Sequence, residues 1–162
     1  MHQQQLYFYL WKMGRIEDEI LQSKFEDDYQ KVIVNVLFTA SWLDVKNIQR
    51  LKPFGISPQQ FNVLRILRGS FPNALRLGDI SNRMIDKNSN ATRLVEKLRQ
   101  KNLVKREVCE HSRRQVDIWI TQEGLSILER IDISMKVWKN EFKDISEAEL
   151  KQLNLLLDKL RD

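Results

Sequence analysis

The sequence predicts a mainly α-helical protein with a small β-hairpin wing, arranged as a six-helix winged helix-turn-helix. Apolar residues recur every three to five positions over most of the 162 residues, which is the spacing of amphipathic helices. Strict alternation occurs once, where Val116, Ile118 and Ile120 are separated by single residues, as in a strand with one buried face. Only 5 Gly and 3 Pro are present, which favours long helices over loops.

The first predicted element is one long amphipathic helix from residue 16 to about 51, within a dimerisation segment spanning 16–52. Pro53 and Gly55 end it. Residues 1–15 precede it as an N-terminal extension. Translation starts either at Met1 or at Met13, and in the second case residues 1–12 are not part of the natural protein. The extension lacks the basic leading region and the small-residue cleavage site of a signal peptide.

Residues 53–120 are predicted to form the winged helix-turn-helix core. Ser57, Pro58 and Gln60 make a capping box that opens its first helix. A loop over 69–73 leads to a short helix at about 78–84. The next helix, which contains the stretch DKNSNATRLVEKL, runs from 86 to about 101. Asn102 is suited to end it, since Asn tolerates the left-handed conformation.

The chain changes from helix to strand after Asn102. Residues 104–110 are expected to pair antiparallel with 116–120. The tip of this hairpin is then formed by His111, Ser112, Arg113 and Arg114. Two further helices make up the C-terminal segment 121–162. Thr121 caps the first, which reaches Phe142, and Ser146 with Glu149 forms a capping box for the second.

The terminal helices carry more apolar surface than a small winged core can cover. Leu150, Leu153 and Leu157, for example, recur along the last helix. Exposed apolar surfaces of this size usually mark an interface. We therefore expect a homodimer formed by residues 16–52 and 121–162, which would present two copies of the winged core.

The positive charge of the chain is concentrated in one segment. Between Arg83 and Arg114 there are ten Lys or Arg and four Asp or Glu residues, a net of +6, so the rest of the +5 chain carries −1. A basic region on a near-neutral body is typical of proteins that bind a polyanion. The alternative, a solvated basic face without a partner, is the less favoured interpretation.

A helical wheel of the predicted fourth helix separates a core side from a polar side. Ala91, Leu94, Val95 and Leu98 fall on the core side. The polar residues expected to contact DNA are Ser89 and Arg93, flanked by Asn90, Thr92 and Lys97. These residue types bond base edges and phosphates in a major groove. The alternative is that Asp86, Asn88 and Ser89 only cap the helix, but capping needs one such residue rather than five.

The hairpin tip supplies a second candidate contact. Arg113 and Arg114 at an exposed turn are suited to a narrow minor groove, where the negative potential is strongest. The alternative is that both are solvated turn residues.

Three stretches carry a resemblance to a known family: GISPQQFNVLRIL, RLVEKLRQKNLVKR and SRRQVDIWITQEG. Residues from about 51 to 128 resemble the MarR family of bacterial transcription regulators. Ile120, Thr121 and Gly124 fit the end of the family's wing signature, and Arg114 falls on the signature arginine. Two positions depart from the pattern. Ser112 stands where the family usually has Asp, which removes an ion pair unless Glu110 replaces it, and Asn102 stands for the usual Gly.

The resemblance implies a homodimer that binds pseudo-palindromic double-stranded DNA, usually as a repressor that a small ligand or oxidation releases. Carried over to this chain, Asn88, Ser89, Asn90, Thr92, Arg93 and Lys97 would read the major groove and Arg114 the minor groove. Four aromatic residues are candidates to line an effector pocket near the dimer interface, although their interpretation as core residues is favoured: Phe38, Trp42, Phe61 and Trp138.

Other functions find little support in the sequence. His2 and His111 are far apart, the single Cys109 has no evident base, and no phosphate-binding loop or metal-spaced cluster occurs. We therefore expect no enzyme activity, no cofactor and no metal, and interpret Cys109 as structural rather than as a redox sensor. One cysteine fits a reducing cytoplasm, and no apolar run spans a membrane. The competing function is a winged-helix module that binds an acidic protein instead of specific DNA.

Overall fold

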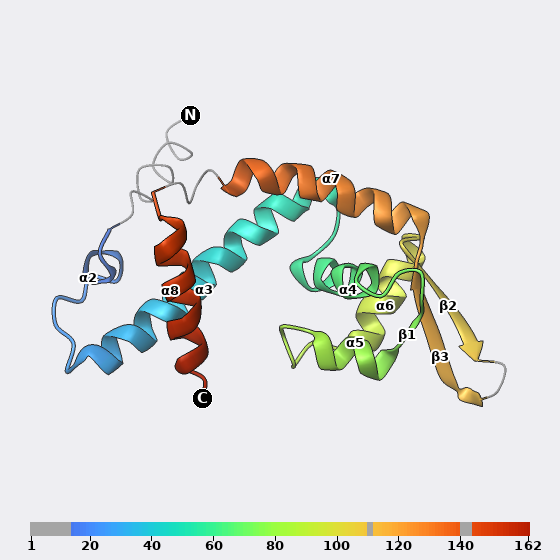
Figure 1. Ribbon diagram of the computed structural model, residues 1–162, viewed down its shortest axis with the longest axis horizontal. Coiled ribbons are helices and arrows are strands. Elements are labelled where there is room, and N and C mark those ends of the chain that lie inside the picture. Colours follow the sequence, from blue (N-terminus) through green and yellow to red (C-terminus); the bar gives the residue numbers. More distant parts are fainter. Residues whose placement is uncertain (1–13, 110–111, 140–143) are drawn as a thin grey trace. The chain divides into compact units, whose positions relative to one another are not determined.

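The computed structural model describes residues 14–109, 112–139 and 144–162 (Figure 1). The chain divides into two units, one ending at Asn47 and one beginning at Ile48. Within the described ranges, no helix combines the length and the apolar character that crossing a bilayer requires.

The first unit shows that the prediction of one continuous helix over residues 16–51 was wrong. Helix α2 spans only Ile16–Glu19, and α3 begins again at Asp28 and ends at Leu51, where the second unit has begun. Between them, Leu21 adopts a left-handed conformation with φ of 55°. Asp27 then caps the new helix, since its Oδ1 accepts a hydrogen bond from the N–H of Gln30 at 2.8 Å. The prediction failed because the three-to-five-residue spacing of apolar residues continues across this break.

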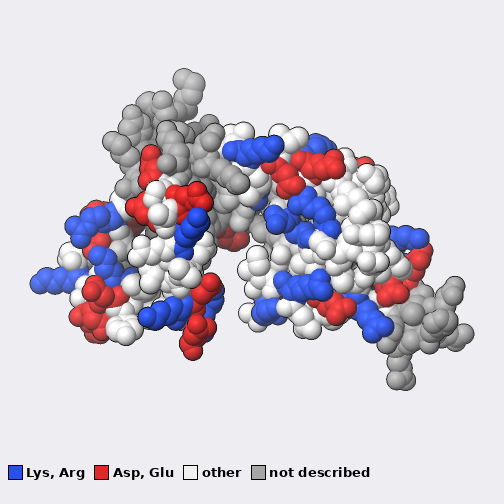
Figure 2. Space-filling view, in the orientation of Figure 1, with Lys and Arg blue, Asp and Glu red and all other residues white. Residues whose placement is uncertain are grey.

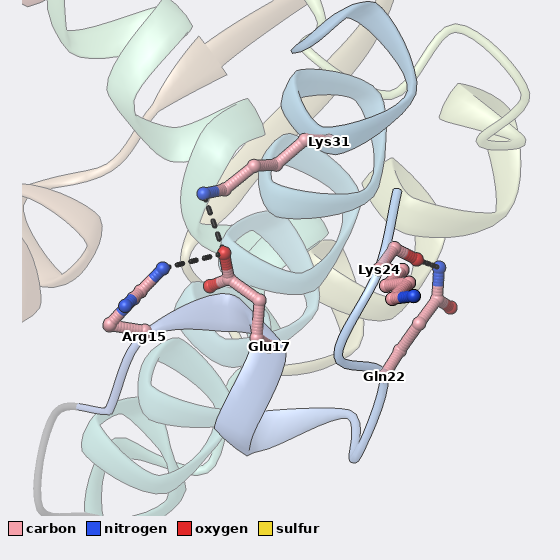
Figure 3. A network of polar contacts seen from close by, with 5 residues as sticks. All are labelled: Arg15, Glu17, Gln22, Lys24 and Lys31. Atoms are coloured by element: carbon pink, nitrogen blue, oxygen red, sulfur yellow. Dashed lines mark hydrogen bonds and ion pairs between the residues drawn. The ribbon is translucent and has the colours of Figure 1, made fainter. Parts of the chain in front are cut away.

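An ion-pair network closes α2 back onto α3 (Figure 3). The Oε1 of Glu17 lies 2.7 Å from the Nζ of Lys31 on α3 and 3.0 Å from the Nη2 of Arg15. The loop itself is closed by the backbone N–H of Gln22, which donates to the carbonyl of Glu17. The side-chain amide of Gln22 also donates to the carbonyl of Lys24. The short helix is thus tied to the long one by polar contacts.

The second unit contains the winged helix-turn-helix, as predicted. After a 3-10 turn at Lys52–Phe54, its helices are α4 (Pro58–Arg68), α5 (Leu77–Arg83) and α6 (Ala91–Gln100). Strands β2 (Val104–Cys109) and β3 (Ser112–Ile120) form the wing. Helices α7 (Gln122–Lys139) and α8 (Glu147–Lys159) follow. Figure 1 shows α7 leaving directly from the end of β3.

The sheet has one strand more than predicted. Leu75–Arg76 forms β1, which pairs antiparallel with β3 through Leu75 and Ile118 and gives the order β1-β3-β2. In the hairpin Val104 pairs with Ile120 and Val108 with Val116, and the register then shifts so that Cys109 pairs with Ser112. A two-residue strand is too short to produce a visible alternation, so only its tertiary partner reveals it.

The predicted caps are confirmed. Ser57 with Gln60 and Ser146 with Glu149 form complete capping boxes at α4 and α8. The Oγ1 of Thr121 accepts from the N–H of Gly124 at 3.0 Å at the start of α7. Asn102 has a φ of 58°, the left-handed conformation expected after α6. Phe142, the predicted end of the helix after the wing, lies outside the described residues.

The hydrophobic core joins α4, α5 and α6 to the inner face of the wing and to the first half of α7. Its fully buried side chains include Leu64, Leu67, Ile80, Leu98, Ile118, Leu128 and Ile131. The core leaves one side of α6 and residues 105–107 of β2 exposed to solvent, which positions the candidate site.

Candidate nucleic-acid interface

Helix α6 begins five residues later than the sequence predicted. Asn90 is its N-cap, since its Oδ1 accepts from the backbone N–H of Arg93 at 3.0 Å. Ser89 and Asn88 therefore lie before the helix, in a turn organised by Asp86. The Oδ1 of Asp86 accepts from the N–H of Asn88 at 3.0 Å, and its Oδ2 accepts from the hydroxyl of Ser89 at 2.7 Å.

This turn changes how the polar cluster is interpreted. The hydrogen bonds from Ser89 and Asn88 hold the pKa of Asp86 below its ordinary value, so its carboxylate stays ionised and fixed. The side-chain oxygen of Asn90 caps the helix and the hydroxyl of Ser89 donates to Asp86 in the preceding turn, although both residues were predicted to contact DNA. We expected one capping residue to be enough for this helix. Two sets of polar residues are needed instead, because a turn that is held by Asp86 leads directly into the helix that is capped by Asn90.

The rest of the wheel agrees with the structure. Ala91, Val95 and Leu98 are buried and Leu94 is half-buried. Thr92, Arg93 and Lys97 are exposed along the other side of α6. Glu96 lies between them and forms an ion pair with Arg99, with Nη2 to Oε1 at 2.8 Å, which lowers the pKa of Glu96. The exposed side of α6 thus presents Thr92, Arg93 and Lys97, next to an ion pair in which Arg99 already binds the carboxylate of Glu96.

The wing places the two predicted arginines on a strand rather than at a turn. Arg113 and Arg114 belong to β3, because Ser112 already pairs with Cys109, so their placement at the hairpin tip was wrong. Glu110 and His111 lie outside the described residues, as do the side chains of Arg113, Arg114 and Cys109. Minor-groove contact by Arg114 therefore stays a prediction.

The fold adds two basic residues that the sequence analysis did not select. Arg76 on β1 and Arg106 on β2 line a pocket of about 310 Å³ together with Thr92 and Glu96 of α6, over an apolar floor that includes Val95 and Ile118. Charge pattern alone was no guide, because the two arginines are 30 positions apart and meet only through the β1-β3-β2 sheet. Figure 2 shows Lys and Arg side chains spread over this unit, with acidic ones between them.

The four aromatic residues predicted to line an effector pocket are divided between the two units. Phe38 and Trp42 lie on α3 in the first unit, where the Nζ of Lys46 is 5.6 Å from the Trp42 ring. Phe61 and Trp138 lie in the second unit, and both rings contact Arg50. Its Cζ is 5.4 Å from the Phe61 centroid and 5.3 Å from the Trp138 centroid.

Arg50 is held tightly in that cluster. Its Nη1 donates to the sulfur of Met135 on α7. Burial lowers the pKa of Arg50, and the charge of Arg65 adds to the effect. Phe61 and Trp138 thus contact the guanidinium of Arg50, and these contacts join the end of α3 to α4 and α7. Among the described residues, no three His, Cys, Asp or Glu side chains gather as a metal site.

Comparison with known proteins identifies this arrangement. The model of the MarR family matches residues 56–116, which span α4 to the wing. The HTH-type transcriptional repressor IacR of Pseudomonas putida is 27% identical over 115 residues, covering 70% of this chain and 68% of that protein. The family model thus matches the part of the chain in which the sequence resembles the MarR family, and this relative is a transcriptional repressor.

Solved structures share the fold. The Staphylococcus aureus MepR–DNA complex aligns with a TM-score of 0.70 and 22% identity, covering 85% of this chain and 97% of that one. Bordetella bronchiseptica BpsR, whose DNA binding is regulated by 6-hydroxynicotinic acid, aligns with a TM-score of 0.65 and 24% identity, covering 80% of this chain and 98% of that one. The winged helix-turn-helix predicted from the sequence is the fold of these proteins.

Proposed function

We propose that this chain, whose residues 56–116 match the model of the MarR family, binds specific double-stranded DNA and represses transcription. The observation that carries the proposal is the exposed side of α6. Thr92, Arg93 and Lys97 stand free of the core on a helix whose start is rigidly capped, beside a wing that carries further arginines. Helices of this kind insert their N-terminal part into the major groove.

We further propose that the binding form is a homodimer. Helix α8 has no buried residue in the single chain, although Leu150, Leu153 and Leu156 lie exposed along it. Ile33 and Leu37 on α3 and Val137 on α7 are also exposed. A second copy would cover such surfaces by two-fold symmetry and set two α6 helices one DNA turn apart. Sedimentation at micromolar concentration should show a dimer, and a monomer would contradict this assembly.

Selection from random duplexes tests the proposed function. Enrichment should yield an inverted repeat whose half-sites are about 10 base pairs apart, centre to centre, since two-fold related helices meet the same groove face after one turn. Salt dependence would discriminate poorly, because an acidic protein partner is also bound electrostatically. If no motif is enriched, the DNA-binding proposal fails. The better interpretation of the basic face is then a protein-interaction module that binds an acidic protein.

We also propose that a small aromatic molecule releases the DNA. The support is the control of BpsR by 6-hydroxynicotinic acid and the aromatic residues Phe61 and Trp138 around Arg50 in this chain. Titration of the protein on its selected operator with aromatic carboxylates, with Trp fluorescence as a direct binding readout, tests this. Release of the operator together with a fluorescence change is expected, and no effect of any such compound would count against effector control.

A further inference from the structure

A large aliphatic side chain lies exposed directly before the turn that leads into α6. Ile85 is 87% exposed, whereas the preceding Met84 is 2% exposed and belongs to the core. Single exposed hydrophobic residues are common on protein surfaces, so exposure by itself carries no conclusion. The position of Ile85 is what distinguishes it.

The backbone at Ile85 is fixed from both sides. Its N–H donates to the Oδ1 of Asn62 on the scaffold helix α4 at 3.0 Å. On its other side, the carboxylate of Asp86 holds the turn through Asn88 and Ser89. Ile85 is therefore presented from an anchored point, and its exposure does not come from a loosely held loop.

The surroundings of Ile85 are polar and charged, with the carboxylate of Asp86 already bound by Asn88 and Ser89. Arg83, Lys87 and Asn88 are exposed beside it, and the Nζ of Lys87 bonds back to the carbonyl of Asn82 at 2.5 Å. Among the residues between Pro72 and Asp132 whose side chains the structure describes, Ile85 is the only large hydrophobic residue that is exposed. One aliphatic group among charges is too small for a protein interface, but it suits a polyanion that offers single apolar groups.

Duplex DNA offers such a group in the major groove, the C5-methyl of thymine. We propose that Ile85 contacts a thymine methyl and sets a thymine preference at one position of each half-site. The inference rests on the proposed DNA-binding function, and it adds a specificity residue outside α6 itself. In this arrangement Asn62 and Asp86 are positioning residues, which hold Ile85 without touching DNA.

Uracil substitution tests the contact, because uracil lacks only the methyl group. On the selected operator, replacing each thymine by uracil in turn should weaken wild-type binding at one symmetric pair of positions. The expected loss is about fourfold per half-site, the effect of burying one methyl group. Ile85→Ser should bind thymine and uracil duplexes equally at that pair, whereas Ile85→Val should keep part of the difference.

Phe71→Ser is the matched control, since Phe71 is an exposed hydrophobic residue of the same unit but lies in the loop after α4. This variant should discriminate thymine from uracil as the wild type does. Because Ile85 and Phe71 are both exposed, neither serine variant should lower the melting temperature much, which circular dichroism verifies. The proposal is overturned if no uracil position weakens binding or if Ile85→Ser retains the discrimination. Failure of the DNA-binding proposal is a separate outcome, in which no operator is selected at all.

Discussion

The Nη1 of Arg68 on α4 lies 2.6 Å from the Oδ2 of Asp132 on α7, so an ion pair joins the scaffold helix of the helix-turn-helix to the helix that follows the wing. Both side chains are partly exposed, which limits its strength. A double-mutant cycle with Arg68→Ala and Asp132→Ala should give a coupling free energy of unfolding of about 0.5 kcal/mol. Denaturant unfolding at one fixed protein concentration measures it. High salt should reduce the coupling, and a value unaffected by salt would contradict this account.

Gly124 at the start of α7 leaves no room for a side chain. A Cβ there would lie 2.3 Å from the carbonyl oxygen of Leu103 and 2.7 Å from Cγ1 of Ile120. Gly124→Ala should therefore lower the free energy of unfolding by about 1–3 kcal/mol, since a backbone atom must move. Gly78→Ala is the matched control: nothing lies within 4 Å of its Cβ position, so it should leave stability unchanged or raise it. Equal melting temperatures for the two variants would refute the packing argument.

Asn90 separates the capping role from DNA contact. Asn90→Ala removes the acceptor for the Arg93 N–H and should cost about 1 kcal/mol of stability. Asn90→Asp keeps the acceptor, and its negative charge interacts favourably with the positive N-terminal end of the helix dipole. This variant should therefore restore the melting temperature. The same variant should still bind the operator more weakly, because it adds a negative charge where phosphates approach. Recovery of both properties together would mean that Asn90 does not face DNA.

Alanine variants of Arg93 and Arg114 are expected to lose DNA affinity in different ways on different operators. Arg93→Ala should weaken binding to the selected operator by about 1–3 kcal/mol, the usual worth of a base contact. Arg114→Ala should weaken binding most on operators with A/T-rich flanks, where the minor groove is narrow. Fluorescence anisotropy on two duplexes that differ only in their flanks measures both variants. An equal loss for Arg114→Ala on both duplexes would count against minor-groove insertion.

Glu17 should titrate far below an ordinary glutamate. Its hydrogen bond with Lys31 lowers the pKa of Glu17 from 4.5 to about 2, helped by Arg15 (Figure 3). The folded pKa is depressed, so the stability that this network adds is present above about pH 4.5 and is lost as the pH falls toward 2. An NMR titration of the Glu17 carboxyl should show this midpoint, and Lys31→Met should raise it toward the ordinary value. Similar midpoints in both proteins would show that Lys31 is not the cause.

Most of the local structure was predictable because its signals are local. Capping boxes at Ser57 and Ser146, the left-handed Asn102 and the alternation at 116–120 each depend on neighbours a few residues away. The break at Leu21 was missed because no Gly, Pro or Asn marks it. The true start of α6 was missed because Asp86 and Asn90 are both capping residues, and only the hydrogen bonds show which of them begins the helix.

The sequence by itself therefore determined the fold class and the polar side of α6, since periodicity and spacing are properties of one segment at a time. The tertiary structure alone decided what depends on distant segments meeting. It paired Leu75 with Ile118 to make a third strand, and brought Arg50 to Phe61 and Trp138. It also closed the space around Gly124 and anchored Ile85 on Asn62. The reason is physical: burial and contact are set by packing across the chain, which no local pattern records.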